Sequence, residues 1–281
     1  MCCCSADTAR RATSNVVCSS MSSGNDATIA VAEKVGGTEQ AFAGIMNSYA
    51  KQLGMKNSNF ENSSGLPGPT HRMSARDIAT LAHAMIAEFP EYYRWYALRE
   101  FEWNGIKQQN RNGLLGRDPS VDGIKTGHTE SAGYCLATSA ERNGMRLISA
   151  VLGTKSMKAR EDASAALLNY GYTFYETVAL KKKGDVLLSP RVYKGEVEMI
   201  PAVVARDVWA TVPRGSAASL VTTTSLNEPL IAPLTAAQTI GQVSITDGTN
   251  TVATVPLVPQ QAVAEGGWWS QLSDTVSLWM R

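Results

Sequence analysis

Two apolar runs separated by Asn143-Gly144 constrain the fold of this chain more than any other feature. Residues 133–140 alternate as a half-buried strand does, and residues 145–152 form a second apolar run. Asn-Gly between such runs is a strong hairpin signal, because the two-residue turn requires positive φ at both positions. Residues 121–128 lie just before the first run. The sequence therefore predicts a hairpin with residues 121–128 as a strand beside it.

That neighbouring strand carries Lys125-Thr126-Gly127, and Ser23-Gly24-Asn25 stands just before a helix that is predicted to start near Asn25 or Asp26 and to stop at Gly36-Gly37. A cation, a hydroxyl and a glycine on a strand that borders a cleft suit an anionic or carbonyl-bearing substrate. Each motif alone also has a plain structural explanation: the first as a solvated strand end, the second as a helix cap. Their occurrence together favours the cleft.

Four stretches of the chain resemble low-molecular-mass penicillin-binding proteins, which are serine-type D-alanyl-D-alanine carboxypeptidases of bacterial cell-wall metabolism. The stretches are residues 23–27, 110–115, 121–128 and 145–151. Penicillin-recognising enzymes combine Lys-Thr-Gly and Ser-x-Asn with a third motif, Ser-x-x-Lys. The resemblance implies an α/β (α+β) transpeptidase-like domain that is incomplete at its N-terminus. A small all-β domain and a terminal amphipathic helix would follow it.

The resemblance also implies roles for individual residues. Ser23, Asn25 and Lys125 are the expected catalytic residues, which relay protons and orient the substrate amide. The expected substrate-binding residues are Thr126, Gly127, His128, Arg111 and Arg160. Among them the backbone N–H of His128 would face the oxyanion, and the two arginines would hold the terminal carboxylate. The alternative for either arginine is a surface ion pair.

The nucleophile of the family has no matching position. The only Ser-x-x-Lys in the 281 residues is Ser48 to Lys51, which follows Ser-Gly-Asn, whereas the active motif of the family precedes it. We therefore expect Ser48 and Lys51 to be solvent-side residues of a helix. Loss of a nucleophile costs several powers of ten in rate. The sequence thus predicts an N-terminally truncated carboxypeptidase that is inactive by itself.

Four segments are expected along the chain. Residues 1–22 lack apolar periodicity, so no stable element is predicted there. Residues 23–177 are expected to form the partial peptidase-like domain. Residues 178–262 are expected to form short alternating strands, and residues 263–281 the terminal helix. With 44% hydrophobic residues, the chain is able to bury a substantial core. Cys2, Cys3, Cys4 and Cys18 do not have zinc-ligand spacing, and neither a metal nor a cofactor is expected.

Apolar spacing predicts which side chains are buried in three places. One helix is expected to bury Phe42, Ile45, Met46, Tyr49 and Leu53, and a later one, from about Met157 to Tyr175, to bury Ala163, Leu167, Leu168 and Tyr170. Cys135, in the first hairpin strand, is expected to be a small buried hydrophobe.

The terminal helix places its tryptophans and aliphatic residues on one face, as in Trp269, Leu272, Val276 and Trp279. Indoles favour the membrane interface, and the family ends in a similar anchor, so the inner-membrane surface is an expected partner. The alternative is packing on the β domain of the chain itself.

A net charge of +1 indicates no nucleic-acid partner. The family lies at the periplasmic face, but this chain has no apparent signal peptide and would remain cytoplasmic as given.

The expected ligands are the peptidoglycan pentapeptide and β-lactams. Two other functions remain open: a non-catalytic cell-wall-binding or scaffolding homologue that binds peptide reversibly, and, less favoured, a β-lactamase. Ser-Gly-Asn and the additional β domain argue against the β-lactamase.

Overall fold

The computed structural model describes residues 16–17, 20–21, 23–103 and 105–280. The chain divides into two compact units, Met1–Tyr172 and Thr173–Arg281, and each is described by itself. Helices and strands are mixed in the first unit, and strands dominate the second. This content confirms the predicted fold class.

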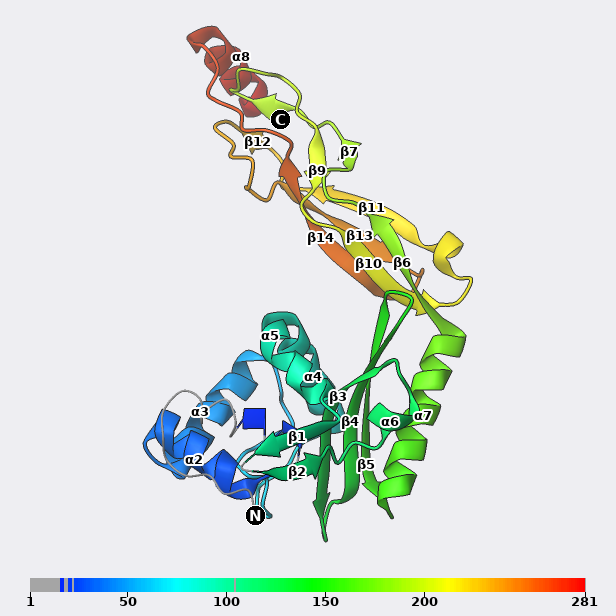
Figure 1. Cartoon of the computed structure of the whole chain (residues 1–281). Helices are drawn as coiled ribbons and strands as arrows, with labels where there is room; N and C mark the ends of the chain where they lie inside the picture. Colours follow the sequence, from blue (N-terminus) through cyan, green and yellow to red (C-terminus); the bar gives the residue numbers. More distant parts are fainter. Residues whose placement is uncertain (1–15, 18–19, 22, 104, 281) are drawn as a thin grey trace. The chain divides into compact units, whose positions relative to one another are not determined.

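The first unit is built on an antiparallel sheet of order β3–β4–β5 (Figure 1). Its strands are β3 (Val121–Thr129), β4 (Gly133–Arg142) and β5 (Met145–Thr154). Asn143 and Gly144 join the last two with φ of 52° and 77°. The predicted hairpin and the neighbouring Lys-Thr-Gly strand are therefore confirmed.

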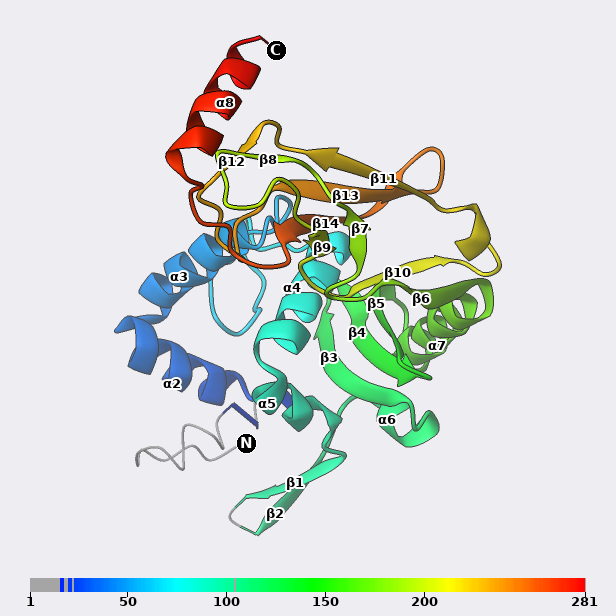
Figure 2. The same cartoon turned by 90° about the horizontal axis from the view of Figure 1, so that it is seen from above.

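Helices cover both faces of this sheet, with α4 (Ala75–Glu88) along one face and α7 (Met157–Phe174) along the other (Figures 1 and 2). Side chains alternate across a strand, so Ala137 of β4 packs towards Ala82 of α4, while Leu136 packs towards Leu168 of α7. The remaining elements of the unit are α2 (Asn25–Gly36), α3 (Glu39–Gln52), α5 (Pro90–Tyr93), η1 (Arg94–Ala97), β1 (Glu100–Trp103), β2 (Ile106–Gln109) and α6 (Leu114–Arg117).

The helix boundaries follow the capping signals of the sequence. The side chain of Thr38 accepts a hydrogen bond from the N–H of Ala41 at the start of α3, and Ser74 accepts one from Asp77 at the start of α4, both at 3.1 Å. Helix α2 runs from Asn25 to Gly36, as predicted.

The predicted buried faces of two helices are partly wrong. In α3 the buried residues are Ala43 and Ala50, whereas Ile45 and Tyr49 are exposed. In α7, Leu168 is 1% exposed, but Leu167 is 49% and Tyr170 is 55% exposed. Helical spacing identifies an apolar stripe, but only the neighbouring elements decide which part of the stripe is covered.

Most of residues 1–22, for which no stable element was predicted, lies outside the described residues. The described members of that segment, residues 16–17 and 20–21, are helical, and Val17, Ser20 and Met21 are buried. At these positions the structure differs from the prediction, because apolar side chains without clear periodicity still pack on the unit.

The second unit has a five-stranded sheet of order β11–β13–β14–β9–β7 and the antiparallel pair β10–β6. Val204, Val243, Val255 and Leu257 are among its fully buried core residues. The elements are β6 (Tyr175–Lys181), β7 (Val186–Leu188), β8 (Val192–Tyr193), β9 (Ala202–Val204), β10 (Val208–Pro213), η2 (Ala217–Ser219), β11 (Val221–Leu226), β12 (Leu230–Ile231), β13 (Gly241–Thr246), β14 (Thr251–Pro259) and α8 (Trp268–Trp279).

Adjacent leucines of α7 provide a test of the packing in the first unit. Leu168→Ala leaves a cavity between α7 and the sheet and is expected to cost about 2–5 kcal/mol of unfolding free energy. Leu167→Ala is the matched control, because its side chain is 49% exposed, and its effect should stay below that of Leu168→Ala. Urea unfolding followed by circular dichroism measures both. Equal losses would contradict the orientation of α7.

Candidate active site

Strand β3 presents the Lys-Thr-Gly motif at the edge of the sheet. Thr126 is buried, with 7% of its surface exposed, while Gly127 and His128 are exposed. Gly127 pairs with Cys135 of β4, and a Cβ added at Gly127 would lie 3.7 Å from that of Cys135. The strand is thus held by β4 along one side, and its backbone is open at the end where Gly127 lies.

The two sequence motifs meet through their side chains. The Nζ of Lys125 donates a hydrogen bond to the Oγ of Ser23, 102 residues away in the chain, and another to the carbonyl of Thr126 at 2.8 Å. Ser23 precedes α2, whose N-cap is Gly24, with Asn25 exposed in the first turn. The structure therefore brings Ser23 and Lys125 together, whereas the side chain of Asn25 has no hydrogen bond to another of the residues that the structure describes.

Burial is the main reason why the pKa of Lys125 falls from 10.5 to about 8. An ammonium loses its hydration in the protein interior, which favours the neutral amine. The positive charges of Arg111 and Arg160 lower the pKa further. Both predicted carboxylate-binding arginines therefore lie close enough to Lys125 to form one electropositive site.

Arg160 is buried, with only 3% of its surface exposed. Its guanidinium donates to the carbonyl of Gly127 at 3.3 Å and to that of Arg111 at 3.2 Å, while its Nε has no hydrogen-bond partner within the described part of the chain. Burial lowers its pKa. Arg160 therefore ties α7 to the Lys-Thr-Gly strand and to the loop before α6, and among the described residues it has no carboxylate partner of the kind that the surface ion-pair alternative requires.

Sequence reasoning missed Tyr134. It faces His128 in the β3–β4 register, with ring centroids 4.0 Å apart, and the guanidinium carbon of Arg160 lies 5.8 Å from the centroid of its ring. The contact orders two predicted site residues at once. The Asn143-Gly144 turn sets the pairing of β4 with β5, not that of β3 with β4, so the turn signal in the sequence does not reveal this contact.

A cavity of about 340 Å³ lies along the site, between α4 and the sheet. Cys135 contributes to its wall and is partly exposed, so the prediction of a buried residue there was wrong. The lining is mainly apolar and comprises Met73, Ile78, Leu81, Ala82, Met85, Tyr96, Ile124, Lys125, Thr126, Gly127, Cys135, Leu136, Ala137 and Leu152.

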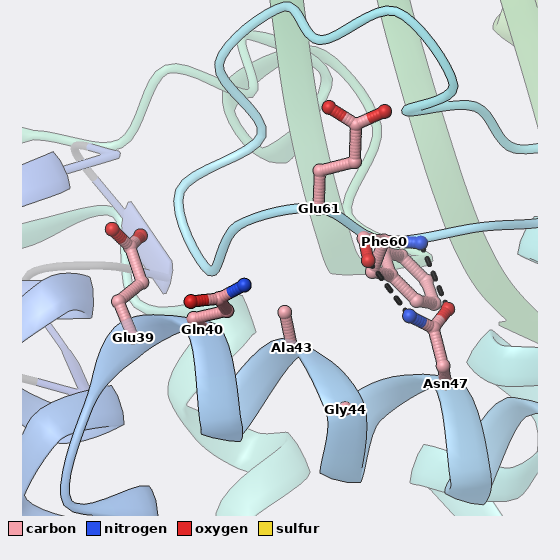
Figure 3. Close-up of a pocket in the computed structure, with 7 residues that line it drawn as sticks. All are labelled: Glu39, Gln40, Ala43, Gly44, Asn47, Phe60 and Glu61. Carbon is pink, nitrogen blue, oxygen red and sulfur yellow. Dashed lines mark hydrogen bonds between the residues drawn. The ribbon is translucent and has the colours of Figure 1, made fainter.

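A second cavity, of about 520 Å³, lies beside α3 and shares no residue with the first. Asn47 and the backbone of Phe60 exchange two hydrogen bonds at its edge, as Figure 3 shows. Glu39, another lining residue, accepts hydrogen bonds from the backbone and the hydroxyl of Ser63. The described part of the chain contains no group of His, Cys, Asp and Glu arranged to hold a metal.

Ser48 and Lys51 lie on the exposed side of α3. The Oγ of Ser48 donates to the carbonyl of Gly44 at 3.0 Å, as helix hydroxyls commonly do. Nothing in the described residues connects this serine with Lys125 or Ser23, which agrees with the solvent-side prediction.

Comparison with known families gives two matches along the chain. Residues 13–156 match the family model described as D-alanyl-D-alanine carboxypeptidase, and residues 175–265 match the model described as penicillin-binding protein 5, C-terminal domain.

Curated relatives include D-alanyl-D-alanine carboxypeptidase DacA of Escherichia coli K12, which is 42% identical over 260 residues, covering 92% of this chain and 64% of the relative. DacC of the same organism is 39% identical over 258 residues, covering 91% and 64%. The chain thus spans less than two thirds of the length of these relatives. Among solved structures, penicillin-binding protein 5 from Haemophilus influenzae superposes with a TM-score of 0.77 at 39% identity, covering 86% of this chain and 72% of that one.

The charges around Lys125 give a measurable prediction. Arg111→Gln removes a like charge, so the pKa of Lys125 should rise from about 8 towards 10.5, with burial keeping it below that limit. An NMR titration of the Lys125 side chain measures this change. Arg76→Gln, an exposed arginine of α4, is the control and should leave the pKa unchanged. An unchanged value in Arg111→Gln would contradict the electropositive site.

Proposed function

Because the chain belongs to the D-alanyl-D-alanine carboxypeptidase family, we propose that its site binds the C-terminal D-alanyl-D-alanine of a peptidoglycan stem peptide. We also propose that these 281 residues by themselves do not cleave it. The observation that carries the first proposal is the half-buried Lys125, which joins Ser23 beside the charges of Arg111 and Arg160.

The chemistry of this site suits the end of a peptide. A terminal carboxylate attracts guanidinium and ammonium groups, and charge-assisted hydrogen bonds are stronger than neutral ones. Arg111 is exposed and free to meet the ligand, whereas Arg160 is buried and bound to backbone carbonyls. In the proposal, Arg111 contacts the carboxylate directly, Thr126 contributes its hydroxyl, and Arg160 keeps the strand in place.

The proposed lack of cleavage follows from the residues that surround Lys125. Peptide cleavage by this family's chemistry uses the serine of a Ser-x-x-Lys motif, which the lysine of the same motif activates and which is placed opposite an oxyanion site. The only Ser-x-x-Lys in the 281 residues is the exposed pair Ser48 and Lys51 of α3. Without a nucleophile in that position, binding does not lead to hydrolysis.

Two assays of the 281-residue chain test this proposal. Isothermal titration with an N-acylated D-alanyl-D-alanine peptide should show reversible binding, and mass spectrometry after incubation with fluorescent penicillin should show no stoichiometric adduct. Arg111→Gln should weaken peptide binding by about tenfold, since it removes a charge-assisted contact. Arg76→Gln should not. A penicillin adduct on Ser48, or release of D-alanine, would overturn the proposal.

We further propose that α8 binds a lipid surface. Trp268, Trp269, Leu272, Val276 and Trp279 are all at least half exposed, with Trp279 at 88%. The opposite side of α8 is fixed to its own unit: the buried Asp274 accepts a hydrogen bond from Arg191 at 2.9 Å and another from the N–H of Lys194. These contacts leave the apolar face uncovered, which supports the membrane over the alternative of packing on the β domain.

None of the helices within the described residues has the length and apolar content to cross a bilayer. A helix with one exposed apolar face instead suits the interface, where indole rings bury their apolar part and keep the N–H near water. The proposal is therefore adsorption of α8 in the plane of the membrane.

Flotation with vesicles of phosphatidylethanolamine and phosphatidylglycerol tests the lipid proposal. Trp279→Ser should lower the vesicle partition coefficient by roughly tenfold or more, because it removes a large apolar side chain from the bound face. Ser273→Ala, on an exposed polar position of the same helix, is the control. Equal binding by the Trp279 variant and the unaltered chain would refute a role for α8.

A further inference from the structure

Ser23 and Lys125 have the arrangement of a nucleophile and its base. We propose that they form a Ser–Lys dyad through which this chain is acylated by small activated carboxylic esters, which it then slowly hydrolyses. This activity goes beyond peptide binding and does not depend on it. Four features of the site support it: the Ser23–Lys125 contact, the backbone at Ser23, the start of α2 and the charges around the amine.

The first feature is direct contact. The Nζ of Lys125 and the Oγ of Ser23 are hydrogen-bonded, which is the contact that lets an amine take the proton of a hydroxyl. Ser-Lys pairs are a known variant of the serine-histidine arrangement. Ser23 is only half-buried, so its oxygen is accessible to a small reagent.

The second feature is the backbone at Ser23, which has φ of 56°. This left-handed conformation costs free energy for a residue with a side chain, and such residues cluster at functional sites. In α/β-hydrolases a strained residue at the start of a helix similarly presents a nucleophilic serine. Here the strained serine stands two residues before α2.

The third feature is the start of α2 itself. Gly24, the N-cap of this 12-residue helix, has no side chain to accept a hydrogen bond from the first-turn N–H groups of Asn25, Asp26 and Ala27. Free N–H groups at a helix N-terminus stabilise negative charge. They lie next to Ser23 in the chain and are the nearest candidates to stabilise the oxyanion, although the carboxylate of Asp26 weakens their field.

The fourth feature is the set of charged and titratable groups around Lys125. Arg111 from the loop before α6 and Arg160 from α7 favour the neutral amine, and burial does so more strongly, giving the pKa of about 8. Tyr96 of η1 and Cys135 of β4 line the same cavity as Lys125. Above pH 8 most of the amine is unprotonated and can act as a base; below it, the ammonium cannot.

Ser23 reacts with p-nitrophenyl acetate in two steps, acylation and hydrolysis. The neutral amine of Lys125 takes the hydroxyl proton of Ser23 while the Oγ attacks the ester carbonyl. The bond from the carbonyl carbon to the phenol oxygen breaks, p-nitrophenolate leaves, and an acetyl ester forms on Ser23. The Lys125 ammonium formed in this step loses its proton to the solvent. The neutral amine then takes a proton from the water that attacks the acetyl ester and gives it to the Oγ of Ser23, which restores the serine and releases acetate.

An activated ester makes a smaller demand on the site than a peptide does. p-Nitrophenolate is a weak base that departs without a proton, whereas an amide nitrogen must be protonated as it leaves. For a peptide, the Lys125 ammonium formed in the attack would have to supply that proton. The ester assay therefore tests the dyad without requiring peptide hydrolysis.

Stopped-flow release of p-nitrophenolate, with peptide mapping of the acetylated chain, tests the inference. The expected result is an initial burst, an acetyl ester on Ser23 that hydroxylamine removes, and a rate that rises with pH through about 8 and then levels off. Ser23→Ala should lower the burst rate by about 100-fold or more, and Lys125→Arg should do the same, because a guanidinium does not act as a base.

Ser48→Ala is the matched control, since Ser48 also belongs to a serine-lysine pair but is exposed on α3, and its burst should equal that of the unaltered chain. Peptide mapping of the acetylated, unaltered chain still tests whether Ser23 is the nucleophile if a Ser23 or Lys125 variant does not fold. An acetyl group on Cys135, or a hydroxylamine-resistant amide on Lys125, in place of the Ser23 ester would overturn the dyad. Peptide binding is measured separately, so failure of either proposal is distinguishable.

Discussion

The hydrogen bond between the half-buried Lys125 and Ser23 is the contact on which the site depends. An ammonium without hydration is stable only where hydrogen-bond acceptors replace water. The Oγ of Ser23 and the carbonyl of Thr126 are those acceptors. The bond to Ser23 joins the start of α2 to β3, although the two residues are 102 positions apart in the chain. Two nearby arginines make the same lysine easier to deprotonate. One contact thus contributes both to the fold and to the chemistry.

The sheet keeps that contact in place from both of its faces. Helix α4 packs over the Ile124 side of β3 and β4, while α7 packs over the Leu136 side and supplies Arg160. Arg160 binds the carbonyl of Gly127, at the exposed end of the motif, and Tyr134 stacks on His128 from the neighbouring strand. Structural residues therefore order the substrate-facing strand from behind, while its front remains accessible.

The family to which this chain belongs and the motifs that the chain itself carries support different conclusions about its function. The family acts on D-alanyl-D-alanine, and this chain carries the Lys-Thr-Gly and Ser-x-Asn motifs in mutual contact. The third motif occurs only at Ser48 and Lys51, on the exposed side of α3. A serine and an amine are nevertheless adjacent, at Ser23 and Lys125, and adjacency of these groups is the physical requirement for acyl transfer.

The sequence by itself determined the hairpin, the Lys-Thr-Gly strand, the helix after Ser23 and the β-rich second unit, because turn chemistry and side-chain periodicity are local. Only the tertiary structure decided that Arg160 is buried on backbone carbonyls, that Tyr134 meets His128, and that Leu167 is exposed where Leu168 is buried. Those outcomes depend on strand register and on which neighbour covers each helix, and neither is encoded within one segment.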